Sequence, residues 1–131
     1  MTKRVMGLVL LSLILFSGVV LGASNELKVL GWMGYYNPEI IEGFEAKYDV
    51  DVKMIEIATY KELFEALDSE NKPDLVITGE LIFPKLINEG YLEPLNKSLI
   101  PNIKNIDPLF KGLSFDPNNE YSLPYHYLTL C

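Results

Sequence analysis

Three short strand-like segments alternate with three segments of helical spacing, and this alternation constrains the fold more than any other feature of the sequence. The strand candidates are residues 27–31, 50–54 and 74–78, and the helix candidates are residues 38–48, 60–67 and 81–89. A helix between two strands carries the chain back to the starting end of the sheet, so such strands pair in parallel. The sequence therefore predicts an α/β fold with a parallel-type sheet and flanking helices.

Local signals mark where these helices begin and end. Asn37 is a typical N-cap residue, Pro38 suits the first helical position, and Thr59 with Glu62 forms a capping-box pattern. Gly90 suits the C-terminal end of the third helix. Apolar residues then recur at helical spacing in the first two helices, and we expect them to form inward stripes: Ile40, Ile41, Phe44 and Tyr48, then Tyr60, Leu63, Phe64 and Leu67.

The chain after Gly90 has weaker patterns. Residues 91–95 look extended, and short helical turns are expected near 100–106 and 107–111. The composition of 116–119 is typical of a turn, and residues 121–125 form a last strand candidate.

The first 23 residues are typical of a secretory signal peptide. Lys3 and Arg4 precede an uncharged, mostly apolar run over 5–21, and small residues follow at 22–24. The alternative is a retained membrane anchor, because the uncharged stretch is just long enough to span a bilayer. We expect cleavage, and a protein that is periplasmic or lies on the extracellular face of the cell membrane.

Composition excludes several classes of protein. The net charge of −7 disfavours nucleic acid as a partner. A single cysteine and a single histidine exclude an internal disulfide, a multi-cysteine metal site and paired-histidine zinc motifs. The sequence has no glycine-rich phosphate loop and no set of residues suited to bond-making chemistry. We expect no enzyme activity, no metal and no cofactor.

Ligands of open parallel sheets bind beyond the carboxyl ends of the strands. The loops expected there are 31–36, 78–81 and 125–127. Aromatic rings and a carboxylate in such loops could form a cage for a cation. The candidate ligand-binding residues are Trp32, Met33, Tyr35, Gly79, Glu80 and Leu81.

Each of these side chains also has a plain structural interpretation. Trp32 could simply pack against the edge of the sheet, and Glu80 could be an acid that favours a helix N-terminus. His126 lies in an apolar context and is interpreted as a structural histidine.

Three segments resemble the periplasmic spermidine/putrescine-binding proteins, which are the solute receptors of polyamine ABC transporters. They are residues 27–52, 73–107 and 115–125, and the last is the most specific to the polyamine branch. The resemblance implies a two-lobed receptor that is a monomer when complete, binds a small cationic ligand and docks on membrane permease subunits. Trp32 and Tyr35 match aromatic residues that help to enclose the polyamine in this family.

The sequence departs from the family pattern at several positions. Met33 stands where a small hydroxyl residue is common, and Gly79-Glu80-Leu81 stands where the family often has Ser-Thr-Tyr. An aromatic wall is thereby lost and an acid gained. We expect residues 24–131 to be a truncated N-terminal lobe that cannot perform the receptor function alone. The alternatives are a receptor for another small organic cation or a metal ion, a small flavodoxin-like enzyme or regulatory module, and an inactive remnant.

Overall fold

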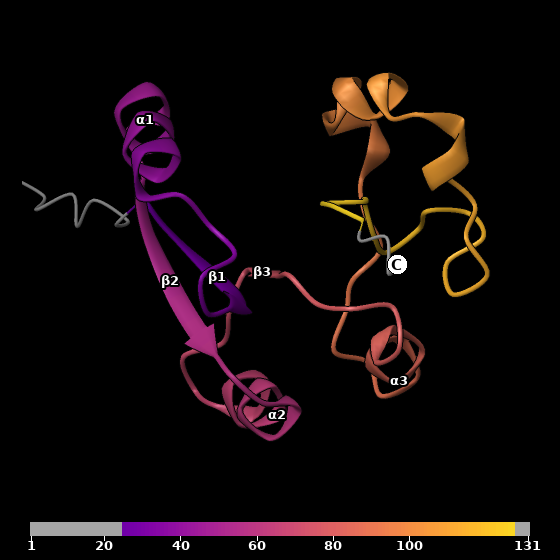
Figure 1. Ribbon diagram of the computed structural model, residues 1–131, viewed down its shortest axis with the longest axis horizontal. Coiled ribbons are helices and arrows are strands. Elements are labelled where there is room, and N and C mark those ends of the chain that lie inside the picture. The colour runs from indigo at the N-terminus through magenta and orange to yellow at the C-terminus, as the bar shows by residue number, and fades with distance from the viewer. Residues whose placement is uncertain (1–24, 128–131) are drawn as a thin grey trace, which may run out of the picture.

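A parallel three-stranded sheet organises the chain. The computed structural model describes residues 25–127, so the predicted leader over 1–23 lies outside the described residues. Strands β1 (Glu26–Trp32), β2 (Asp51–Ile57) and β3 (Leu75–Val76) pair in parallel in the order β2-β1-β3 (Figure 1). The predicted α/β class and parallel sheet are confirmed.

The two strand pairs differ greatly in length. Strands β1 and β2 pair over seven residues, from Glu26 opposite Asp51 to Trp32 opposite Ile57. Strand β3 pairs with β1 at only two residues, although the sequence predicted a buried strand over 74–78. Its first residue, Leu75, is 52% exposed, so the prediction of a buried strand is wrong here. A buried strand needs both faces of the sheet covered, and among residues 25–127 the face that carries Leu75 is open.

The helices begin where the capping signals predict. Helix α1 (Pro38–Tyr48) has the Asn37 side chain as its cap, and α2 (Tyr60–Asp68) begins after Thr59. The Thr59 hydroxyl accepts from the Glu62 N–H at 3.2 Å, and the Glu62 carboxylate accepts from the Ala58 N–H at 2.7 Å. The hydrogen bond from Ala58 lowers the pKa of Glu62 below its ordinary value. Helix α3 (Phe83–Asn88) is shorter than predicted.

The hydrophobic core joins the sheet to α2 and α3. Its fully enclosed residues come from β1, β2, α2 and α3: Leu30, Ile57, Leu63, Leu67 and Leu86. Helix α1 contributes no buried residue. Three of the four residues of its expected inward stripe are exposed instead, with Ile40 at 69% and Tyr48 at 56%, because little of the described part of the chain covers that face. The fourth, Ile41, is half-buried.

Beyond α3 the chain forms short 3₁₀ helices and loops. The helices are η1 (Lys97–Leu99), η2 (Pro101–Asn105) and η3 (Pro108–Phe110), which confirms the expected helical turns. The strand predicted over 121–125 is wrong: within residues 25–127 that segment belongs to no sheet. A strand needs a pairing partner, and the nearest pairing in the described part of the chain is a single hydrogen bond from the Leu95 N–H to the Glu120 carbonyl at 2.7 Å, just before this segment.

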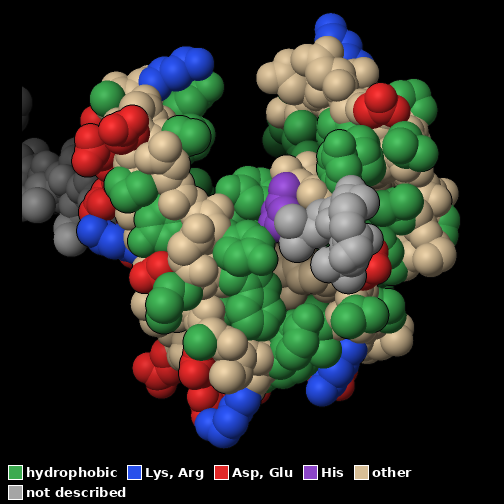
Figure 2. Space-filling view, viewed as in Figure 1, with side chains coloured by type: hydrophobic (Ala, Val, Ile, Leu, Met, Phe, Trp, Pro, Cys, Tyr) green, Lys and Arg blue, Asp and Glu red, His purple; other side chains and the backbone are tan. Residues whose placement is uncertain are grey.

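The molecule has two arms separated by a wide notch (Figure 2). One arm holds α1 with β1 and β2, and the other holds the 3₁₀ helices and the segment after them (Figure 1). Hydrophobic side chains gather at the base of the notch. No helix within residues 25–127 has the length and apolar character needed to cross a membrane.

Candidate ligand-binding site

Trp32 ends β1 and forms an aromatic corner with Tyr60. It is partly buried and packs against the hydrophobic core, as its structural interpretation expected. Its ring also meets the Tyr60 ring nearly at right angles, with 5.2 Å between centroids and 87° between planes. Tyr60 is the first residue of α2 and stays 39% exposed. The corner therefore combines a stabilising edge contact with an accessible aromatic surface.

A tight turn follows Trp32. The Tyr35 N–H donates to the Trp32 carbonyl at 3.2 Å, and the Met33 N–H donates to the Ile57 carbonyl at 3.1 Å. Gly34 has a φ of +78°, a conformation that glycine adopts without strain. The turn leaves the side chains of Met33 and Tyr35 exposed, at 64% and 43%.

The segment 125–127 returns to this turn from 90 residues further along the chain. The Tyr125 hydroxyl donates to the Tyr35 carbonyl at 2.8 Å. The His126 ring lies 5.1 Å from the Tyr35 ring and 5.2 Å from the Tyr125 ring. His126 is exposed rather than buried among apolar side chains. The first candidate loop, 31–36, therefore lies in contact with the last candidate loop, 125–127.

The loop after β3 approaches the aromatic corner through Gly79. A Cβ atom on Gly79 would lie 3.6 Å from the Tyr60 hydroxyl oxygen. Glu80 and Leu81 follow in a turn, in which the Phe83 N–H donates to the Glu80 carbonyl at 3.3 Å. The cap of α3 is Ile82, which makes no side-chain capping bond. Among residues 25–127 the Glu80 carboxylate has neither a hydrogen-bond partner nor an ion-pair partner.

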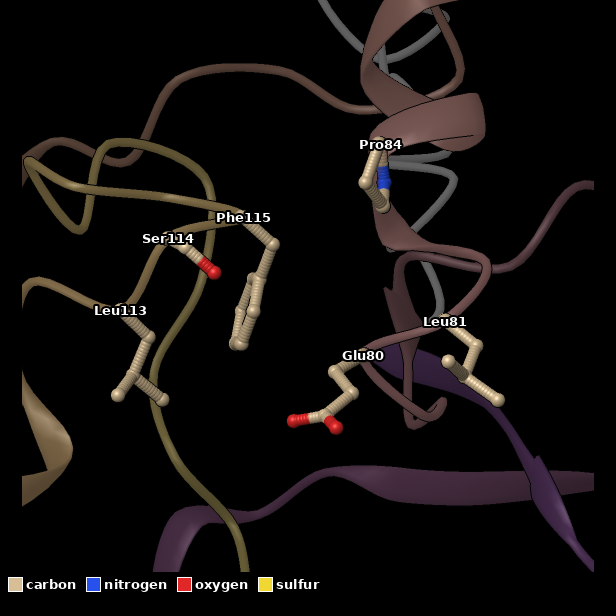
Figure 3. A pocket seen from close by; sticks show the side chains of 6 residues that line it. All are labelled: Glu80, Leu81, Pro84, Leu113, Ser114 and Phe115. Carbon is tan, nitrogen blue, oxygen red and sulfur yellow. The ribbon is translucent and has the colours of Figure 1, made fainter.

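The Glu80 carboxylate faces a pocket of about 430 Å³. The pocket lies between the start of α3 and the loop over 113–115, and its remaining lining is mostly apolar (Figure 3). Phe115 and Leu113 point into the same space as Glu80 (Figure 3). A carboxylate beside apolar walls favours a cationic group that also carries hydrocarbon.

Asp116 fixes the backbone that carries Phe115. Its side chain is 4% exposed and accepts hydrogen bonds from the Glu120, Tyr121 and Ser122 N–H groups and from the Ser122 hydroxyl, at 2.8–3.0 Å. Burial alone would raise the pKa of Asp116, but these hydrogen bonds outweigh burial and hold the pKa below its ordinary value. The Phe115 ring also packs on the Phe83 ring of α3 at 5.4 Å.

The predicted residues thus fall into three linked groups. Trp32 and Gly79 share Tyr60 as a neighbour, Tyr35 contacts Tyr125 and His126, and Glu80 with Leu81 borders the pocket. Met33 is exposed in the turn between the first two groups. Sequence analysis missed Tyr60 and four pocket residues, namely Pro84, Leu113, Ser114 and Phe115.

One signal could have identified Tyr60. It follows the N-cap Thr59 only three residues after β2 ends, so it too lies beyond the carboxyl end of a strand. The residues of the 113–115 loop carry no comparable signal. In the described part of the chain, no group of three His, Cys, Asp or Glu side chains could hold a metal ion.

Comparison with known proteins identifies the family. Residues 31–131 match the family model described as bacterial extracellular solute-binding protein. The chain belongs to this solute-binding protein family. The description of this family names solute binding and no enzymatic reaction.

The chain is similar to curated proteins that are named as polyamine-binding proteins. The chain is 29% identical over 104 residues to the spermidine/putrescine-binding periplasmic protein of Escherichia coli, covering 78% of this chain and 30% of that protein. It is 32% identical over 119 residues to the putrescine-binding periplasmic protein SpuD of Pseudomonas aeruginosa, covering 87% and 32%. This solute-binding protein therefore spans about 30% of the length of the curated relatives that it matches.

Solved structures of polyamine-type receptors share the fold. The spermidine/putrescine ABC transporter substrate-binding protein PotD of Streptococcus pneumoniae superposes with a TM-score of 0.73 at 30% identity, over 76% of this chain and 31% of that chain. The Tp0655 (TpPotD) lipoprotein of Treponema pallidum gives 0.68 at 27% identity, over 77% and 32%. The described sheet and helices are thus part of one lobe of a periplasmic-binding-protein fold.

Proposed function

We propose that this chain provides one wall of the ligand site of an extracytoplasmic polyamine receptor, which supplies spermidine or putrescine to an ABC importer. One observation carries the proposal: beyond the carboxyl ends of parallel strands lie exposed aromatic rings and the Glu80 carboxylate, which has no partner among residues 25–127. A polyamine presents ammonium groups on a flexible hydrocarbon chain, which such a surface would recognise. The names of the curated relatives support the same ligand class.

The proposed site uses the six residues that sequence analysis singled out. The rings of Trp32 and Tyr35 attract ammonium groups, each worth about 0.5–2 kcal/mol depending on how far water is excluded. Glu80 adds a charge-assisted hydrogen bond to an amine. Met33 and Leu81 contact the methylene chain, and Gly79 leaves room beside the aromatic corner.

The remaining parts of the proposal concern location and partners. Residues 1–23 export the protein, and residues 24–131 form part of the first of two lobes that close on the ligand by a hinge motion. The closed form is recognised by membrane permease subunits. The protein binds its ligand and catalyses no reaction.

The test is a binding comparison among matched small molecules. The full 131-residue chain, kept in a mild non-ionic detergent, is titrated with spermidine, putrescine, choline and uncharged 1,4-butanediol. Binding is followed by saturation-transfer NMR, which detects millimolar affinity. The chain supplies only one wall of the site, so we expect binding that is too weak for a complete receptor. Both polyamines should bind saturably with half-saturation in the millimolar range, below about 10 mM. The diol, which has the carbon chain of putrescine without its charges, should not bind.

Two results would contradict the proposal. The first is an equal response to putrescine and the diol, because recognition would then not depend on the ammonium groups. The second is no saturable response to either polyamine. Saturable binding of choline alone would instead identify a receptor for another organic cation.

A further inference from the structure

Tyr60 occupies a central place among the strand ends, although its helical spacing suggested a core residue. Its ring meets the Trp32 ring at the end of β1, and its hydroxyl oxygen lies 3.6 Å from the Cβ position of Gly79 after β3. The tyrosine itself follows β2. The Tyr60 side chain therefore lies at the place where all three strands end.

The capping box of α2 holds Tyr60 in this place. The Thr59 hydroxyl and the Glu62 carboxylate bond reciprocally around the first turn of the helix, so the backbone before and after Tyr60 is fixed. The side chain is nevertheless 39% exposed, unlike the next two residues of its stripe, Leu63 at 0% and Leu67 at 5%. A tyrosine that only filled the core would lose more of its accessible surface than this.

The neighbouring loop leaves the hydroxyl end of Tyr60 accessible. Gly79 carries no side chain there, and a Cβ atom at 3.6 Å would be in ordinary van der Waals contact, so any longer side chain would cover the hydroxyl. Thr78 in the same loop has a buried hydroxyl with no hydrogen-bond partner among residues 25–127. Buried hydroxyl groups usually have a hydrogen-bond partner, so the Thr78 hydroxyl at this edge of the sheet can still form a hydrogen bond.

We propose that Tyr60 is a specificity-determining residue, whose ring forms the second aromatic wall of the ammonium site beside Trp32. The inference rests on the proposed polyamine function and adds a residue to that site. The ring meets Trp32 nearly at right angles, so an ammonium group in the corner contacts two aromatic surfaces.

The test separates the aromatic ring from the space it fills. Tyr60→Phe keeps the ring, Tyr60→Leu keeps apolar volume without it, and Tyr48→Leu makes the same change at a distant exposed tyrosine of α1. Each full-length variant is titrated with spermidine while the indole N–H resonance of Trp32 is recorded. We expect Tyr60→Leu to weaken binding about fivefold or more, and the other two variants to stay within about twofold of the parent chain.

Each outcome decides one claim. Parent-like binding by Tyr60→Leu overturns the inference and leaves the polyamine function standing. Equal weakening by Tyr60→Phe and Tyr60→Leu also overturns it, because the hydroxyl rather than the ring would then matter. No saturable response in the parent chain overturns the proposed function, and the inference with it. A melting temperature recorded for every variant shows whether a loss of binding follows a loss of folding.

Discussion

Replacing Asp116 with alanine should destabilise the protein far more than a typical loop substitution. The side chain is 4% exposed and accepts four hydrogen bonds, three of them from backbone N–H groups. Alanine removes every acceptor and leaves these donors with no partner inside the loop. The Asp116 interactions also hold the backbone beside Phe115, so the pocket wall should loosen together with the loop.

The expected loss of unfolding free energy is the difference between the hydrogen bonds that Asp116 makes and the cost of burying its carboxylate. A hydrogen bond to a charged group contributes about 1.5–3 kcal/mol, but four such bonds are offset by the cost of burying the carboxylate. Water also reaches part of the loop once the carboxylate is gone. We expect a net loss of about 3 kcal/mol in the free energy of unfolding, which is a large share of the roughly 5–15 kcal/mol typical of a domain.

The assay is urea unfolding of the full chain, followed by circular dichroism, with Asp107→Ala as the control. Asp107 is also a loop aspartate that accepts a backbone hydrogen bond, but it makes a single bond, to the Leu109 N–H at 2.8 Å, and is exposed. We expect a loss of about 0.5–1 kcal/mol for this control. If the two variants unfold within about 0.5 kcal/mol of each other, the reasoning about buried hydrogen bonds is refuted.

The contribution of Asp116 should also depend on pH. Its folded-state pKa lies below the ordinary value of 3.8, so the carboxylate stabilises the fold above that pH. The stability is lost as the pH falls from about 3.8 through the lower folded-state pKa. The gap between the parent chain and Asp116→Ala should therefore shrink in acid, and a gap that widens in acid would contradict the assignment.

Three further predictions concern the site and its scaffold. In the same saturation-transfer NMR titration, Trp32→Ala should weaken spermidine binding more than tenfold, or about 1.4 kcal/mol, whereas Phe44→Ala on the exposed face of α1 should leave the half-saturation concentration unchanged. Glu80→Gln should weaken binding about threefold to fivefold at low salt and less at high salt, and a salt-independent effect would argue against a charge contact. Thr59→Ala should cost about 1 kcal/mol in urea unfolding through loss of the α2 cap, with Thr59→Ser close to the parent chain.

Short-range patterns predicted the scaffold well, because they depend on neighbouring residues. Asn37 and Thr59 cap the helices that their sequence context indicated, and Gly90 takes a φ of +76° after α3. The order of strands and helices then required parallel pairing. Local chemistry was therefore enough to predict the sheet and the edge at which the candidate loops lie.

Features that depend on distant partners could not be predicted in this way. Helical spacing gave the direction of Tyr60 around α2, but not that the first turn of α2 extends past the strand ends. Phe115 and Glu80 line the same pocket although 35 residues separate them in the sequence, and no pattern of residue spacing predicts such a contact. The strand candidate over 121–125 likewise gave no indication of whether another strand would pair with it.

The most direct test of the central claim is chemical-shift mapping of the full chain during a spermidine titration at constant ionic strength. The account predicts saturable shifts of the indole N–H of Trp32, the single tryptophan in the sequence, and of the amides of Gly79 and Glu80 with the same midpoint. Shifts that are absent from these residues, or that map to α1 while the strand ends stay unchanged, would contradict it.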